Sequence, residues 1–264
     1  RLTQRLESLQ RGVQRWGEGD LSVRVPVRGH DEVADLAARF NHAAERVETL
    51  VKSHKSLLAN ASHELRSPLT RIRMGLELMG HSPTPAFKDE IARNIAELDQ
   101  LIDEILLASR LDAQEVDIGT VEPVDLTGLA AEECARQSIE LETGSDSAAV
   151  TVDGVPKLLR RALRNLIENA RRYGTGAITI GVRREGERAV LRVSDRGPGV
   201  PPNLRERIFE PFYRLPGASE RSGGVGLGLA LVKSIAQRHK GTAYCEDRSG
   251  GGASFVVELP LRNM

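Results

Sequence analysis

The sequence predicts an all-α N-terminal region followed by an α/β sandwich. Up to Leu111, apolar residues recur at intervals of three and four, which is the period of an amphipathic helix. After Leu111, short strand-like runs alternate with two helical patterns, and consecutive runs can pair as hairpins. This mixture favours a sandwich of helices on a hairpin-paired sheet over a doubly wound parallel sheet.

Composition limits the kinds of partner. The 37 basic residues balance 37 acidic residues, so no net field attracts the chain to nucleic acid or to an anionic membrane. No apolar run approaches the roughly 20 residues that span a bilayer. Cys134 and Cys245 lack a metal-binding spacing, so we expect buried thiols and assign them no function. Because the chain begins at Arg1 rather than at methionine, we expect a soluble fragment of a longer protein.

Two helices are predicted before the first long break. The first runs from Leu2 to Trp16 and ends where glycines and Pro26 disturb the period. The second begins at Asp31 and meets no glycine or proline before Pro68. One continuous helix should therefore lead into the region around Pro68.

A third helix follows the break HSPTP, where Thr84 is placed as N-cap and Pro85 as first helical residue. It should pair with the second helix as an antiparallel hairpin. Each helix carries one apolar stripe, so two helices cannot close a core. A symmetric dimer that forms a four-helix bundle is the economical solution. The alternative is a monomeric hairpin packed on the second half of the chain.

The second half contains the predicted α/β elements. Its first helix turns an apolar face inward through Leu159, Ala162, Leu163 and Leu166. In chain order, the elements are strand 148–152, helix 155–173, strands 177–182 and 188–194, helix 226–239, and strands 242–247 and 253–259.

The stretch ASHELRSPLTRIR places His63 on the wet side of a helix. The apolar residues of this helix cluster within about 60° of one direction, and His63 points roughly opposite, on the face of Ser67 and Thr70. Pro68 removes a helical hydrogen bond to Glu64, at a cost of about 3 kcal/mol or more. An exposed imidazole beside a carboxylate and a loosened backbone suits a nucleophile. By itself, however, an exposed histidine is usually an ordinary surface residue.

The segment RNLIENARRYG places Asn165 and Asn169 one turn apart on the flank of the helix over 155–173. Neutral amides there can orient a divalent cation and phosphates without the cost of buried carboxylates. The alternative is a pair of asparagines that make ordinary hydrogen bonds.

Two glycine motifs follow. In SDRGPGV a strand ends at Asp195, and Gly197 and Gly199 allow the backbone to approach a planar ligand. The simpler interpretation is a tight turn. In SGGVGLGLALVKSIA, glycines precede a helix whose free N–H groups can meet phosphate. The second motif lacks the Walker Lys-Ser/Thr and opens no βαβ unit, which excludes P-loop and Rossmann interpretations. Its glycines after the first are Gly224, Gly226 and Gly228.

Together and in this order, these motifs make the chain resemble a sensor histidine kinase of bacterial two-component systems. SHELRSPL resembles the H-box, NLIENARRYG the N-box, DRGPG and GGVGLGLAL the two glycine boxes, and RIFEPFYR the F-box. GDLSVRVPVRGHDEVADLAARFN is similar to the HAMP signal-relay module, which usually follows a membrane span. The resemblance covers essentially the whole chain.

The resemblance implies three modules. They are a HAMP-like coiled-coil module over 1–50, a dimerisation and histidine-phosphotransfer hairpin over 51–115, and a catalytic ATP-binding domain over 116–264. The last would be an α/β sandwich of the gyrase/Hsp90/histidine-kinase/MutL type. It also implies a homodimer, and a chain that is the cytoplasmic portion of a bacterial inner-membrane protein whose membrane-spanning sensor region lies upstream.

On the histidine helix, the resemblance implies that His63 is the phosphoacceptor and Glu64 a base that polarises its imidazole. Ser67 stands where many members have a threonine or asparagine that positions water for phosphatase activity. Asn169 would hold Mg²⁺, with Asn165 assisting. Asn165 also replaces the glutamate with which ATP-hydrolysing relatives activate water, which favours transfer to histidine over hydrolysis.

Around the nucleotide, Arg172 would reach the phosphates and Tyr173 would pack near the adenine. Asp195, beside Gly197 and Gly199, would accept a hydrogen bond from the adenine amino group. The segment 201–225 would be a mobile lid anchored by two phenylalanines. The lid would close on the phosphates through the second glycine box. The anchors are Phe209 and Phe212, and the glycines are Gly224, Gly226 and Gly228.

The function implied is transfer of the ATP γ-phosphoryl group to His63 and then to an aspartate of a response regulator receiver domain. Two other interpretations stay open at this level. One is an ATP-binding scaffold whose dimer relays conformation without chemistry, and the other is a superfamily ATPase that only hydrolyses. His63 and Asn165 argue against hydrolysis alone.

Overall fold

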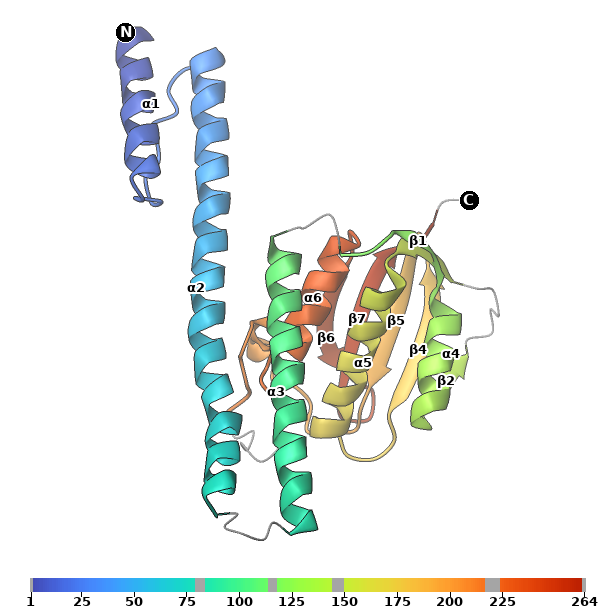
Figure 1. The fold of residues 1–264 in the computed structure, drawn as a ribbon. Coiled ribbons are helices and arrows are strands. Elements are labelled where there is room, and N and C mark those ends of the chain that lie inside the picture. The colour runs from blue at the N-terminus through green and yellow to red at the C-terminus, as the bar shows by residue number, and fades with distance from the viewer. Residues whose placement is uncertain (1, 79–83, 114–117, 144–149, 217–223, 263–264) are drawn as a thin grey trace. The chain divides into compact units, whose positions relative to one another are not determined.

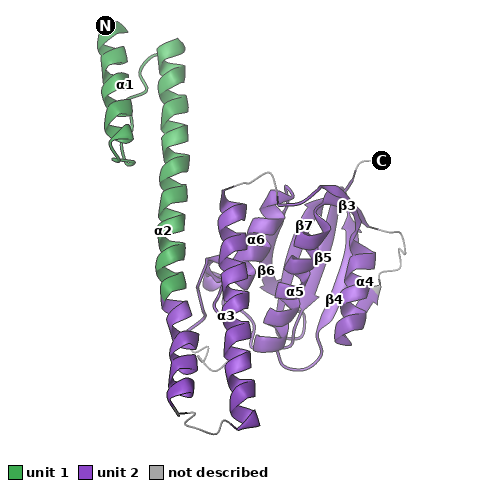
Figure 2. Cartoon of the chain, viewed as in Figure 1, with its two compact units in different colours: residues 1–62 green, residues 63–264 purple. Residues whose placement is uncertain are grey.

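The structure is a computed structural model that describes residues 2–78, 84–113, 118–143, 150–216 and 224–262 (Figure 1). By their internal contacts, the residues divide into two compact units, 1–62 and 63–264 (Figure 2). None of the helices within the described ranges combines the length and apolarity needed to cross a bilayer.

The first unit contains α1 (Leu2–Gly17), a connector without regular structure, and the first part of α2 (Glu32–Leu78). Gly12 of α1 is buried against Val25 of the connector, and a Cβ atom at position 12 would overlap the valine side chain. The connector can therefore pack closely on α1 only because this residue is glycine.

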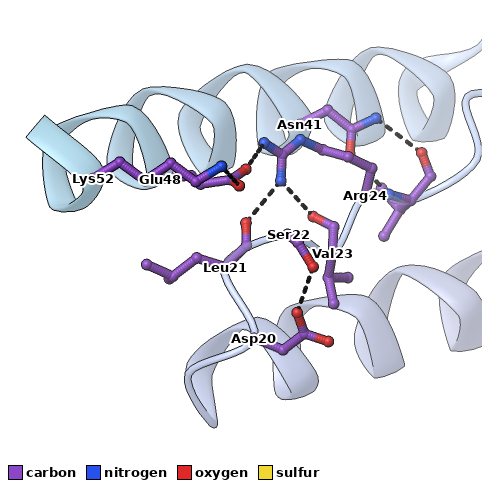
Figure 3. Close-up of polar contacts among 9 residues, drawn as sticks. Asp20, Leu21, Ser22, Val23, Arg24, Asn41, Glu48 and Lys52 are labelled. Carbon is purple, nitrogen blue, oxygen red and sulfur yellow. Dashed lines mark hydrogen bonds and ion pairs between the residues drawn. The ribbon is translucent and has the colours of Figure 1, made fainter.

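The connector is also fastened to α2 by polar contacts (Figure 3). The Asn41 side chain accepts from the Val25 N–H at 2.8 Å and donates to the Val25 carbonyl at 2.9 Å. Arg24 donates to two connector carbonyls and forms an ion pair with Glu48 at 2.7 Å. These contacts satisfy backbone groups that an irregular segment would otherwise leave unpaired.

The predicted helix boundaries around the hairpin agree with the structure. α2 continues through Pro68 as one helix, and α3 spans Pro85–Asp112. Thr84 is the N-cap residue and Pro85 opens the helix as expected, although the threonine side chain makes no capping hydrogen bond. The turn between the helices, 79–83, lies outside the described residues.

The remainder of the second unit is the α/β sandwich. Helices α4, α5 and α6 cover one face of a five-stranded sheet of order β2-β4-β5-β7-β6 (Figure 1). Strands β1 and β3 form a separate antiparallel pair. The elements are β1 (Glu122–Asp125), α4 (Leu126–Gln137), β2 (Glu140–Thr143), β3 (Thr151–Gly154), α5 (Pro156–Tyr173), β4 (Thr179–Glu185), β5 (Arg188–Ser194), η1 (Pro202–Leu204), η2 (Arg207–Phe209), α6 (Gly228–Arg238), β6 (Thr242–Asp247) and β7 (Ala253–Pro260).

The pairing of the strands largely follows the prediction. The consecutive strands β4 and β5, and β6 and β7, pair antiparallel as the predicted hairpins. β5 also pairs antiparallel with β7, although α6 and β6 lie between these two strands in the chain. β2 pairs with β4 in parallel, which the sequence did not predict, because β1, α4 and β2 carried no recognised pattern. The predicted strand over 148–152 appears later in the chain, as β3, and residues 144–149 are not described.

The sandwich is held by one apolar face of α5 and by an ionic contact to α4. Leu163, Leu166 and Ile167 are fully buried, and each such side chain stabilises the fold by roughly 1.5–3 kcal/mol. At the edge of this face, Arg164 and Arg160 donate to Glu133, which is 1% exposed. Hydrogen bonds from Arg164, and then from Arg160, lower the pKa of Glu133 to about 2.

Candidate active site

A cavity of about 640 Å³ lies between α5, the start of α6 and α3, within the second unit. Its volume is in the range of roughly 300–1,000 Å³ that is typical of small-molecule sites. The predicted site residues that line it are Asn165, Asn169, Arg172, Tyr173, Asp195, Gly199, Gly224, Gly226 and Gly228. The fold therefore brings together the three motifs of the second half in one cavity.

The two asparagines have different surroundings. Asn165 is 4% exposed, and its amide donates to the Gly228 carbonyl at 3.1 Å, which fastens α5 to the start of α6. Asn169 lies one turn further along α5, half-buried at the cavity. Among the described residues, no cluster of histidine, cysteine and carboxylate side chains could hold a metal ion. Any cation here would take amide and phosphate oxygens as ligands, which suits Mg²⁺.

Asp195 follows β5 directly and is 4% exposed. Its Oδ1 atom accepts from the Gly197 N–H at 2.7 Å and from the Ala253 N–H at 3.4 Å. Among the described residues, Oδ2 has no protein donor. A buried carboxylate oxygen at a cavity wall is suited to accept from a ligand.

The second glycine box forms a narrow backbone cradle. Gly224 has φ +126°, and a Cβ atom there would overlap the guanidinium of Arg172. Gly226 has φ +80°, its carbonyl accepts from the Phe212 N–H at 2.9 Å, and a Cβ atom there would lie 3.0 Å from Phe212 Cα. The positive φ at both positions, and the close approach of Gly226 to the Phe212 backbone, require glycine. α6 begins directly afterwards at Gly228. The cradle and the helix N-terminus are suited to phosphate groups.

His63, Glu64 and Ser67 lie on α2, and His63 is exposed as predicted. Glu64 forms an ion pair with Arg214 at 3.3 Å, and Arg214 itself lines the cavity. This contact joins the helix that carries the histidine to the cavity that the glycine boxes form. Arg214 ends the F-box stretch RIFEPFYR, but no local pattern assigned it a role.

Helix α3 supplies a wall of the cavity that the sequence did not predict. Glu104 is 7% exposed and accepts from Arg161 at 3.1 Å and from Gln100 at 3.0 Å. Burial raises the pKa of Glu104, against the opposing effect of the Gln100 hydrogen bond. Only the helical period of this segment was visible in the sequence. The α3 residues at the cavity are Glu97, Gln100, Leu101 and Glu104.

The predicted lid over 201–225 is described only in part. It contains η1 and η2, and Phe209 is buried. Phe212 has φ 63°, a left-handed conformation that is costly for a bulky residue. Residues 217–223 lie outside the described residues, so closure of this segment stays a prediction.

Comparison with known proteins shows the family. Family models match the HAMP domain at residues 1–49, the His Kinase A (phospho-acceptor) domain at 53–114, and the histidine kinase-, DNA gyrase B- and HSP90-like ATPase at 154–263. The sensor protein RstB of Escherichia coli K12 is 37% identical over 261 residues, 96% of this chain. The chain belongs to the sensor histidine kinases. Its C-terminal domain is accordingly an ATP-binding domain of that family.

A second similar sensor histidine kinase, CpxA of Escherichia coli K12, is 35% identical over 242 residues, 88% of this chain. The matched region makes up 59% of RstB and 52% of CpxA, so the chain spans somewhat more than half the length of these kinases.

Solved histidine kinases share the fold. Full-length ShkA in complex with AMPPNP has a TM-score of 0.54 at 27% identity, over 80% of this chain and 46% of that one. ThkA in complex with the response regulator protein TrrA has a TM-score of 0.65 at 23% identity, over 88% of this chain and 68% of that one. AdeS of Acinetobacter baumannii has a TM-score of 0.62 at 22% identity, over 76% of this chain and 98% of that one.

Proposed function

We propose that this chain autophosphorylates His63 from Mg-ATP and passes the phosphoryl group to an aspartate of a response regulator. The observation that supports this best is the ion pair between Glu64 and Arg214. It joins the residue next to the exposed histidine to a cavity that has the size and groups for a nucleotide. A scaffold would need the cavity, but it would not need an exposed imidazole beside it.

In the proposed reaction, an imidazole nitrogen of His63 attacks the γ-phosphorus of ATP. The bond to the bridging β–γ oxygen breaks and ADP leaves, while Glu64, as the base, polarises the imidazole and takes the proton from its other nitrogen. Arg172 and Arg214 offset charge on the phosphates, and Asp195 fixes the adenine. Most of the rate enhancement would come from position and charge, as in phosphoryl transfer generally.

The residues at the cavity also fit a magnesium ion. Asn169 would hold it and Asn165 would assist, because both offer amide oxygens near the phosphate cradle. When bound, the ion would neutralise charge on the phosphates. Asn165 has its amide nitrogen engaged by Gly228, which leaves its oxygen for this role.

We propose that two copies of the chain form the four-helix bundle. Several large apolar side chains on the hairpin are exposed in the single chain, and a second hairpin would bury them. The exposed side chains are Leu69, Met74, Leu76, Ile95, Ile102 and Leu106.

We also propose that the chain is part of a longer sensor protein anchored in a membrane. The HAMP match and the greater length of RstB and CpxA support its being part of a longer sensor protein.

A second activity, dephosphorylation of the same regulator, is supported by Ser67. Its side chain is exposed one turn beyond His63, where a docked regulator that takes the phosphoryl group would also meet it. Ser67 would position the water that attacks the aspartyl phosphate.

Incubation with γ-labelled Mg-ATP tests the kinase proposal. We expect a label that acid removes and alkali leaves, as for phosphohistidine. His63→Gln should remain unlabelled yet bind ATP as the parent does, because His63 lies outside the cavity. His42→Gln, another exposed histidine of α2, should label normally. A labelled His63→Gln variant would assign the phosphoacceptor elsewhere, and no label in the parent would favour the scaffold.

A further inference from the structure

Ser67 is engaged by a residue that the proposed mechanism does not use. Arg71, one turn along α2, donates from Nη1 to Ser67 Oγ at 3.0 Å. The hydroxyl thus uses one lone pair on Arg71 and keeps its second lone pair and its proton. Within the part of the chain that the structure describes, the Ser67 hydroxyl donates to no protein acceptor.

Other hydroxyls on the same helix behave differently. Ser62 donates to the Leu58 carbonyl, and Thr70 donates to the Arg66 carbonyl, each at 2.8 Å. This bond to the carbonyl four residues earlier is the usual local partner of serine and threonine in a helix. Within the described residues Ser67 makes no such bond, and its hydroxyl oxygen accepts from Arg71 instead.

At this position a backbone carbonyl is unusually available to accept a hydrogen bond from the Ser67 hydroxyl. Pro68 lacks an N–H, so the Glu64 carbonyl loses its helical donor. The carbonyls of His63 and Glu64 are four and three residues before Ser67, both within reach of its hydroxyl in a helix. Without Arg71, we expect the Ser67 hydroxyl to rotate and donate its proton in a hydrogen bond to one of these two carbonyls.

Arg71 is itself fixed from α3. Its Nε donates to Asn94 Oδ1 at 2.6 Å and its Nη2 to Glu97 Oε2 at 2.7 Å. Asn94 is buried, and its amide nitrogen donates to the Glu90 carbonyl at 2.9 Å, so its oxygen must face Arg71. The planar guanidinium is therefore held at three points, and a lysine could not make the same fork.

We propose that Arg71 is a positioning residue for Ser67 in dephosphorylation of the response regulator, an inference that rests on the proposed function. The water oxygen forms a bond to phosphorus, and the bond from phosphorus to the aspartate oxygen breaks. The aspartate leaves as carboxylate, and the water protons stay with the phosphate released. Ser67 orients this water with the lone pair and proton that Arg71 leaves free.

The test uses the full chain and a phosphorylated receiver protein. The probe is whichever receiver, among those of the source organism, takes the label fastest from the labelled chain. We expect Arg71→Ala to lower the kcat of phosphate release roughly ten- to a hundredfold, as loss of orientation does, without changing KM for the receiver. His63 should label at the parent rate in this variant, which also shows that the hairpin is folded.

A double-mutant cycle separates positioning from a merely structural role. Ser67→Ala should be as slow as Arg71→Ala, and the combined variant should be no slower than Ser67→Ala alone. Arg73→Ala is the matched control, because Arg73 lies on the same helix and, within the described residues, its side chain pairs with exposed Glu77 and with no other group. It should release phosphate at the parent rate.

Three results would each overturn the inference. The losses in kcat could add in the double variant, Arg71→Ala could change KM alone, or Arg71→Ala could release phosphate as fast as the parent. A parent that labels His63 and transfers, but releases no phosphate from the receiver, would overturn it too and leave the kinase function standing. A parent that does not label His63 would overturn the proposed function itself.

Discussion

At the scale of single residues, Asp195 shows how one side chain can serve fold and ligand with different atoms. Oδ1 is used by the Gly197 and Ala253 N–H groups, and Oδ2 is left for the cavity. Asp195→Asn can keep the first contact through its amide oxygen, but it replaces the second acceptor by a donor. The fold should therefore tolerate the change while the adenine amino group meets another donor.

We expect Asp195→Asn to lose about 1.5–3 kcal/mol of ATP binding, roughly ten- to 150-fold in affinity. Titration calorimetry with ATP measures the loss, and the melting temperature of the variant without nucleotide checks that the fold is kept. Equal affinities of parent and variant would place the adenine elsewhere in the cavity.

At the scale of elements, a buried histidine joins the end of α6 to the start of α5. His239 Nδ1 donates to the Ile235 carbonyl at 2.7 Å, and Nε2 accepts from the Val155 N–H at 3.0 Å. Only the neutral imidazole can do both. Burial, and then the nearby charge of Arg238, lower the pKa of His239, whereas the Ile235 hydrogen bond opposes this.

This pKa shift predicts the direction of a pH effect on stability. Because the folded-state pKa is lowered, the unfolded chain binds the proton first as pH falls. The stabilisation is thus complete above the ordinary value of 6.5 and is lost as pH falls below it towards the folded pKa. Urea unfolding should show a lower unfolding free energy at about pH 5.5 than at about pH 8.

His239→Gln is the matched variant, because its side-chain oxygen can accept from the Val155 N–H and does not titrate. It should be less stable than the parent near pH 8 and should lose less stability on acidification. A variant with the parent's full pH dependence would show that other groups cause the effect. Buried Glu133 is one such group, although its pKa of about 2 places its titration in stronger acid.

At the scale of the whole molecule, α2 is one helix from Glu32 to Leu78 and carries both the HAMP region and His63. A rotation of the relay module can therefore be transmitted along a single backbone. Inserting one alanine after Glu48 should turn everything downstream by about 100°, whereas a seven-residue insertion leaves only about 20° of drift.

We expect the one-residue insertion to change the rate of His63 labelling strongly in either direction, and the heptad insertion to change it little. Because the harmless insertion is the longer one, the pair controls for length. Labelling with Mg-ATP measures both. Parent rates in both variants would mean that the residues between the module and the hairpin are a passive linker.

The amino-acid sequence alone determined the elements and the order of the motifs. Hydrophobic periodicity is a local property, so it located α1, α2, α3, α5 and α6 and most strands, together with Thr84 as N-cap. The motif residues were equally visible, since each box is contiguous in the chain. Their individual catalytic and binding roles stay predictions.

Only the tertiary structure decided which distant residues meet. No local pattern relates the segments that meet in three places. These are the Glu64–Arg214 ion pair, the α3 wall of the cavity, and the contact of Arg71 with Asn94. β2 was missed because it is a short strand that pairs in parallel with β4, without a hairpin turn to mark it. Periodicity says which face of an element is apolar, but packing between elements selects the polar side chains that come into contact at their edges.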